Sequence, residues 1–151
     1  MTGRLRDHDG REPAVNVERS APSSGEETVR TVLPAVAPSV AAARRFVAAA
    51  MRRHEAQPEM IDTACLLTSE LVTNALVHAG SRVELAVSTL GRGIRVEVGD
   101  ASRATAQPRA IGAEAVAGRG LHIVEAMSSR WGTNAAGAGK RVWFELDGTM
   151  A

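Results

Sequence analysis

The stretch TSELVTNALVHAG, Thr68 to Gly80, has the apolar density of a buried helix but carries Glu70 and Asn74 four residues apart. At roughly 100° per residue, positions four apart share one helix face. Because an unpaired buried carboxylate is costly, both side chains need a partner or solvent. Two interpretations stay open. The pair forms an exposed strip, or it lines a ligand cavity with Glu70 as a base and Asn74 as an oxygen ligand for Mg²⁺.

The segments before this stretch predict a strand and two helices. A short strand is expected over Thr28 to Leu33, ended by Pro34. Apolar residues at helical spacing predict a helix over residues 40–55, with arginines on its wet face. The quoted stretch then belongs to a second helix, with Pro58 in its first turn and Gly80 as its stop.

The segments after it predict two hairpins separated by a helix. SRVELAVSTL and IRVEVGD alternate apolar and polar residues around Gly91-Arg92-Gly93. Residues 101–117 have no clear period, so we expect a long connection of the binding-loop or lid type. A helix is expected from about Gly120 to Ser129, followed by a hairpin from Arg130 whose closing strand begins at Lys140.

This order predicts a two-layer α/β sandwich. Strands joined by short turns pair antiparallel, and the helices are needed to cover one sheet face. Strands and helices do not alternate regularly, which argues against a doubly wound parallel sheet. Residues 1–26 are charged and aperiodic, so we expect a disordered tail followed by one domain over 27–151.

Composition narrows the classes of function. The formal net charge of +1, the 3% aromatic content and the absence of Tyr argue against a nucleic-acid partner. The single Cys65 excludes an internal disulfide and a cysteine zinc cluster, and is expected to be a small core residue. No segment reads as a membrane span or a secretory signal, so we expect no membrane partner and a cytoplasmic location. Lys140 is the only lysine among 18 basic residues, a bias typical of a GC-rich genome.

Two other places carry chemistry-bearing residues. Asp100 ends the strand IRVEVGD, where a carboxylate accepts a hydrogen bond from a ligand amino group or simply ends the strand in a turn. Gly118-Arg119-Gly120-Leu121 opens a helix, where glycines let the backbone approach a ligand and free N–H groups favour anions. A flexible turn is the alternative interpretation of these glycines.

Two phosphate-binding motifs can be excluded. GAGK, residues 137–140, lacks the first glycine of a P-loop, is followed by Arg141 instead of Ser or Thr, and precedes a strand. GRGLHI, residues 118–123, does not complete the dinucleotide-binding pattern.

Taken in order, E-L-V-T-N on an early helix, Asp100 at a strand end, G-R-G-L opening a helix and a final V-W-F-E-L strand resemble the GHKL (histidine kinase-like) ATPase superfamily. Within it, the sequence resembles more closely the single-domain ATP-binding proteins related to bacterial anti-sigma factor serine kinases, from about Thr28 to Leu146. The resemblance implies a Bergerat-type fold, with a mixed, mostly antiparallel sheet covered on one face by helices.

The resemblance also implies roles for individual residues. Asn74 would ligate a Mg²⁺ ion that bridges the ATP phosphates, and Glu70 would be the general base for transfer of the γ-phosphoryl group. Asp100 would accept a hydrogen bond from the adenine amino group. The Gly118-Arg119-Gly120-Leu121 segment would form the junction between lid and helix over the phosphates.

The implied function is a regulator that binds a sigma factor and phosphorylates Ser or Thr on an anti-sigma-factor antagonist, with a possible homodimer. Two departures bear on it. Asp100 is followed by Ala-Ser-Arg-Ala instead of the D-x-G-x-G pattern, and Arg141 follows Lys140 where relatives often have Thr. A non-catalytic, nucleotide-gated protein-binding module and a detached histidine kinase catalytic domain remain the alternatives.

Overall fold

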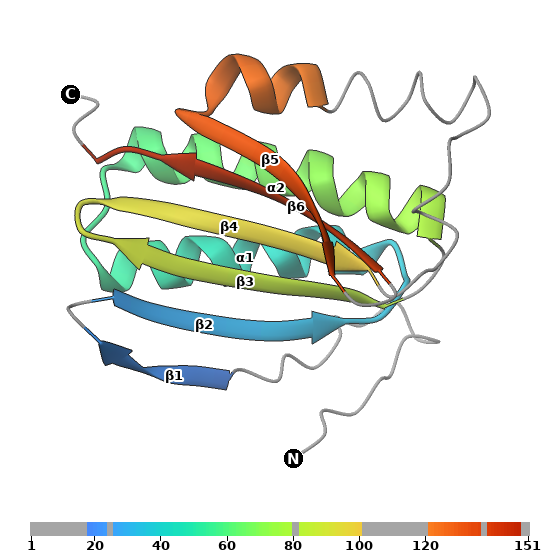
Figure 1. Ribbon diagram of the computed structural model, residues 1–151, viewed down its shortest axis with the longest axis horizontal. Coiled ribbons are helices and arrows are strands. Elements are labelled where there is room, and N and C mark those ends of the chain that lie inside the picture. Colours follow the sequence, from blue (N-terminus) through green and yellow to red (C-terminus); the bar gives the residue numbers. More distant parts are fainter. Residues whose placement is uncertain (1–17, 24–25, 80–81, 101–120, 137–138, 149–151) are drawn as a thin grey trace.

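The computed structural model describes residues 18–23, 26–79, 82–100, 121–136 and 139–148. Its helices lie together on one side of a six-stranded sheet (Figure 1). The elements in chain order are β1 (Glu18–Ser23), β2 (Glu26–Leu33), α1 (Pro38–Arg53), α2 (Pro58–Ala79), β3 (Val83–Leu90), β4 (Gly93–Asp100), a helical segment over 121–127, β5 (Arg130–Ala136) and β6 (Gly139–Leu146).

The strand order is β1-β2-β3-β4-β6-β5. The β3–β4 hairpin pairs from Leu90 opposite Gly93 to Val83 opposite Asp100. β6 pairs with β4 from Ile94 opposite Leu146 to Asp100 opposite Lys140, and β5 lies outside β6. The predicted two-layer α/β sandwich is confirmed. The pairings among the described strands are all antiparallel, so the mixed component of the expectation is not found there.

β1 lies inside the stretch that was expected to be a disordered tail. Its residues, ERSAPS, have no alternation of apolar and polar side chains, but their backbone pairs with β2 through a register shift between Ser20 and Ser23. An edge strand can be held by its ladder of backbone hydrogen bonds alone, so hydrophobic periodicity does not detect it. Residues 1–17 lie outside the described residues.

The core lies between the sheet and the two long helices. The predicted alternation holds, because Val83, Leu85 and Val87 of β3 are buried on the face that the helices cover. β4 and β6 supply the same face with Val96 and Phe144, which are fully buried. Pro58 begins α2, as predicted.

α2 is the one described helix that is long and apolar enough to cross a membrane by length and composition. The expectation that no segment would qualify rested on uninterrupted apolar runs, whereas α2 reaches a mean hydropathy of 1.3 with polar residues interspersed. In the fold it packs on α1 and on β4. A core helix passes the same test, so we interpret α2 as the central helix of this sandwich.

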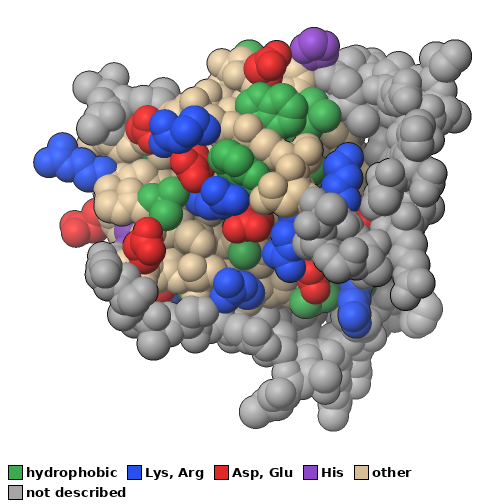
Figure 2. Space-filling model, viewed as in Figure 1, with side chains coloured by type: hydrophobic (Ala, Val, Ile, Leu, Met, Phe, Trp, Pro, Cys, Tyr) green, Lys and Arg blue, Asp and Glu red, His purple; other side chains and the backbone are tan. Residues whose placement is uncertain are grey.

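The opposite face of the sheet carries a line of alternating charges (Figure 2). The line links Glu84, Arg141, Glu97, Arg95, Glu145 and Arg130 through pairs of 2.8–3.9 Å. Arg95 also lies 4.1 Å above the ring of Trp143. On the neighbouring strand Gly132 makes room for this indole, because a Cβ there would come within 2.7 Å of the ring. The charged side chains on this face therefore form ion pairs with one another.

Candidate functional site

The contact between helices and sheet is tight at one end of β4 and β6 and loosens toward the other. On the helix-side face, Ile94 and its partner Leu146 are buried, as are Val96 and Phe144. Toward the other end Val98 is still buried, but Val142, Asp100 and Lys140 are only half-buried. We call the region around Ile94, Leu146 and Phe144 the packed half, and the region around Asp100, Lys140 and Val142 the open half.

α2 runs from the packed half to the open half. Met60, near its start, lines the same hollow as Ile94, at the start of β4. From Met60 the helix rises about 21 Å to Asn74 at 1.5 Å per residue. From Ile94 the strand rises about 20 Å to Asp100 at 3.3 Å per residue. α2 and β4 also end on the same side of the molecule (Figure 1). Asn74 therefore lies about level with Asp100, and Glu70 lies one helical turn before it.

Glu70 and Asn74 lie on the flank of α2 that turns away from α1. Cys65 marks the other flank, because its thiol donates a hydrogen bond to the carbonyl of Arg44 on α1 at 3.5 Å. Nine residues at about 100° each place Asn74 roughly 180° from Cys65. In Figure 1 the helical segment 121–127 is drawn on the side of α2 away from α1.

Both side chains are half-buried, in contrast to Thr73 between them, which is exposed. Within the part of the chain that the structure describes, neither Glu70 nor Asn74 forms a hydrogen bond or an ion pair. A carboxylate and an amide in this state can bind solvent or a polar ligand. Their partial burial distinguishes them from Thr73, and both interpretations of the pair stay open.

Asp100 is the last residue of β4 and lies between Val83 of β3 and Lys140 of β6. It shares the helix-side face with Val98 and Val96, because side chains two apart along a strand point the same way. The predicted strand end is confirmed. Sequence reasoning missed Lys140, which the pairing of β4 with β6 brings next to Asp100.

Leu121 begins the described part of the helix predicted from about Gly120. It is partly buried and packs against the core, and Val124, which is fully buried, anchors the segment 121–127. Gly118, Arg119, Gly120 and residues 101–104 lie outside the described residues, so the predicted junction and the altered loop after Asp100 have no structural counterpart here.

Among the residues that the structure describes, no group of three or more His, Cys, Asp or Glu side chains could hold a metal ion. A Mg²⁺ ion bound with a nucleotide does not need one, because it takes one or two protein oxygens and completes its shell with phosphates and water. The Asn74 amide oxygen and the Glu70 carboxylate, which have no partner among the residues that the structure describes, fit that kind of site.

Cys65 is not a competing nucleophile. Burial raises the pKa of its thiol above the ordinary value, with Asp62 adding to the effect, while Arg44 and Arg52 act in the opposite direction. The thiol is therefore held neutral, and it is the thiolate that reacts. This is consistent with the predicted core role, although the residue is only partly buried.

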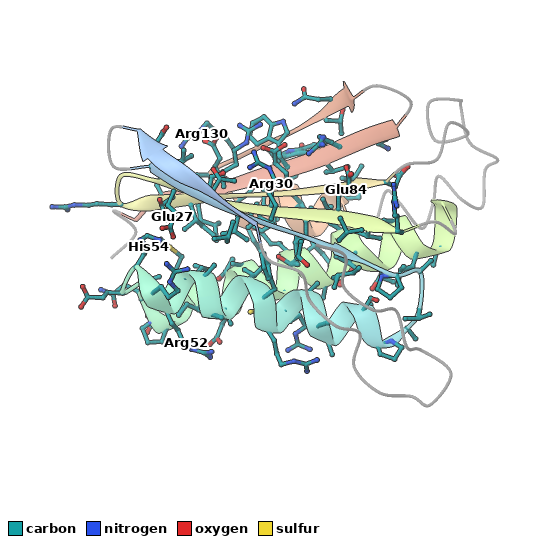
Figure 3. The ribbon with its side chains drawn as sticks, turned by 90° about the horizontal axis from the view of Figure 1, so that it is seen from below. Glu27, Arg30, Arg52, His54, Glu84 and Arg130 are labelled. Atoms are coloured by element: carbon teal, nitrogen blue, oxygen red, sulfur yellow. The ribbon has the colours of Figure 1, made fainter. Side chains whose placement is uncertain are left out.

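A hollow of about 260 Å³ lies at the packed-half end, at the edge of the core. Its lining includes His54 and Gln57 from the connection between α1 and α2, and Gly91 and Arg92 from the β3–β4 turn. Beside it the Nε2 atom of His54 lies 3.3 Å from a carboxylate oxygen of Glu27, as Figure 3 illustrates. None of the predicted site residues lines this hollow.

Comparison with protein families identifies the family of this fold and covers both halves. A family model described as a histidine kinase-like ATPase domain matches residues 33–146, which is 114 of the 151 residues. The match includes α1, α2 and the four strands from β3 to β6. No curated protein matches the sequence.

Proposed function

Because this chain belongs to the histidine kinase-like ATPase domain family, we propose that it binds Mg²⁺-ATP at the open half and phosphorylates Ser or Thr of a small anti-sigma-factor antagonist. The same chain would bind and sequester a sigma factor. ATP binding is the property that the family supports directly. The kinase activity and the partners are our proposal, and they follow from the resemblance of SELVTNALVHAG and GRGLHIVEAMSSRWG to the anti-sigma factor kinases.

One observation carries the proposal. Glu70 and Asn74 are half-buried, have no partner among the described residues, and lie on one flank of α2 about level with Asp100. A neutral oxygen ligand for a nucleotide-bound Mg²⁺ and a potential base for an acceptor hydroxyl, four residues apart on one flank, would suit phosphoryl transfer from ATP.

Each residue would have a separate task. Asp100 would accept a hydrogen bond from the adenine amino group and orient the base. Asn74 would hold the metal through its amide oxygen. Glu70 would take the proton of the acceptor hydroxyl. The hydroxyl oxygen would bond to the γ-phosphorus as the bond from that phosphorus to ADP breaks. Mg²⁺-ATP supplies the phosphoryl group and neutralises charge, and the protein contributes mostly positioning.

With these partners the chain would act in the cytoplasm, and a homodimer is part of the same proposal.

A second candidate is a nucleotide-gated binding module without catalysis. The absence of both glycines in Asp100-Ala101-Ser102-Arg103-Ala104 favours it, because the wall of the adenine site would differ. Glu70 argues against it, since binding alone needs no base.

The test measures Mg²⁺-ATP affinity and transfer to candidate antagonists, with an acid-stable phosphoprotein as the product. Glu70→Gln should keep nucleotide binding and lose transfer, whereas Asn74→Ala should lose binding of Mg²⁺-ATP itself. Thr73→Ala is the matched control, because Thr73 is exposed on the same turn. Normal binding and transfer by both site variants would show that the assignment is wrong. Binding without transfer by the wild type would support the second candidate.

A further inference from the structure

Lys140 is the only lysine of the chain, and the other 17 basic residues counted with it are arginine. The exception stands at the second residue of β6, directly opposite Asp100 on β4. A general preference for arginine explains the 17 and leaves the one lysine unexplained, so its surroundings are informative.

Lys140 points to the helix-side face of the sheet. Directly opposed residues of an antiparallel pair have their side chains on the same face, and Asp100 shares that face with the buried Val96 and Val98. Lys140 is half-buried. Within the described residues it forms no ion pair and no hydrogen bond through its side chain.

Its neighbour Arg141 behaves differently. The Arg141 guanidinium lies on the other face of the sheet, 3.3 Å from Glu84 and 3.9 Å from Glu97. The labelled Glu84 lies on the side of the sheet away from the helices (Figure 3). Of the two consecutive cations, Arg141 is therefore paired on the charged sheet face, and Lys140 has no partner among the described residues at the open half.

We propose that Lys140 is a base-recognition residue, whose ammonium group donates a hydrogen bond to the N1 ring nitrogen of adenine while Asp100 accepts one from the adjacent amino group. This inference rests on the proposed ATP site. A carboxylate only accepts and an ammonium only donates, which matches the neighbouring donor and acceptor on that edge of adenine.

The geometry favours the base over the phosphates. Opposed residues of an antiparallel pair have Cα atoms about 4.5–5.5 Å apart, so the two side chains can converge on adjacent atoms of one ring. A phosphate bound by Lys140 would lie next to the Asp100 carboxylate and be repelled. The neutral edge of a base offers an acceptor to Lys140 and a donor to Asp100.

The single lysine makes a direct test possible. The full chain is treated with an amine-acetylating reagent, and the rate of modification at Lys140 is followed by mass spectrometry, with the N-terminal amine as the internal reference. Saturating Mg²⁺-ATP should slow acetylation of Lys140 about tenfold or more and leave the N-terminal amine unchanged. Mg²⁺-tripolyphosphate, which has no base, should not protect Lys140.

A variant pair provides the second measurement. Lys140→Met should weaken Mg²⁺-ATP binding about tenfold or more, the loss expected for a hydrogen bond to a charged group. Arg141→Met, the matched control on the other face, should leave the affinity unchanged. Weaker discrimination between ATP and GTP in Lys140→Met would support a base contact.

The outcomes separate the two proposals. If the wild type does not bind ATP in calorimetry, the proposed function fails and takes this inference with it. If ATP binds but does not protect Lys140, or if tripolyphosphate or GTP protects it equally, only the role of Lys140 is overturned. Because protection is measured on the wild type, a variant that fails to fold does not decide the question.

Discussion

The packed half and the open half are built from the same three elements, yet they differ in what fills them. In the packed half α2, β4 and β6 meet through side chains that are almost fully buried, among them Leu67, Val96 and Phe144. One to two turns further along α2, Glu70 and Asn74 are half-buried and lack partners among the described residues. In the open half Leu71 and Val72 still bury α2 against the core, so the two polar side chains are held in place by apolar neighbours and not by polar contacts of their own.

This difference separates stability from function along one helix. Substitutions in the packed half should lower the free energy of unfolding and disturb the site only indirectly. Substitutions of Glu70 and Asn74 should change ligand binding and leave the ligand-free stability nearly constant, because these side chains have no polar partner among the described residues to lose.

The largest effect is expected from Phe144→Ala. Phe144 is fully buried, so the variant loses its burial and leaves a cavity, which lowers the free energy of unfolding by about 3–5 kcal/mol. Urea unfolding measures the loss. Arg141→Ala, three residues away on the charged face, is the control and should change it by less than about 1 kcal/mol. Equal losses in the two variants would mean that the packed half is not the stabilising region.

The next effect concerns ligand-linked stability. Mg²⁺-ATP at 100 times its Kd should stabilise the wild type by about 2.7 kcal/mol, because it binds only the folded state. Asn74→Ala should lose most of this gain and keep its ligand-free stability. Thermal unfolding with and without Mg²⁺-ATP measures both quantities. A variant that is destabilised without ligand but still gains fully from Mg²⁺-ATP would assign Asn74 to the packed half instead.

A smaller effect is expected at Cys65, near the point where α2 passes between the halves. Burial raises the pKa of its thiol, so the folded state favours the protonated form. The resulting stability is complete below the ordinary pKa of a thiol and is lost as the pH rises through the raised value. Cys65→Ala should therefore flatten the decline of stability at alkaline pH. An unchanged decline would show that other groups cause it.

The smallest effect is expected from Val77→Ser. Val77 is 62% exposed in the last turns of α2, so its removal should change the free energy of unfolding by no more than about 0.5 kcal/mol. Leu67→Ala, ten residues earlier and fully buried, is the comparison and should cost about 2–5 kcal/mol. Similar values for the two would remove the distinction between the halves.

Local patterns in the sequence predict most of the elements. Alternation predicts β3 and β4, and Pro58 marks the start of α2. Helical periodicity also places Glu70 and Asn74 on one flank. These features depend on residues that are close together in the sequence, so a single sequence is enough to predict them.

Features that depend on distant pairing escape this reasoning. β1 has a polar sequence and is held by backbone pairing with β2, so its composition does not predict a strand. Lys140 and Asp100 are 40 residues apart, and only the pairing of β4 with β6 shows that they are neighbours. From the sequence alone, Lys140 only illustrates the bias toward arginine. The register of β4 and β6 makes it a neighbour of the candidate site.

The indole of Trp143, stacked between Gly132 and Arg95 on the charged face, has an optical consequence. The chain has two Trp and no Tyr, so its intrinsic fluorescence comes from two indoles. The other, Trp131, lies opposite Phe144 on the helix-side face and packs against the core. The two indoles therefore lie on opposite faces of the sheet. In a Trp143→Phe variant, Trp131 would be the remaining source of tryptophan fluorescence. Its emission would report on the contact between sheet and helices without any attached dye.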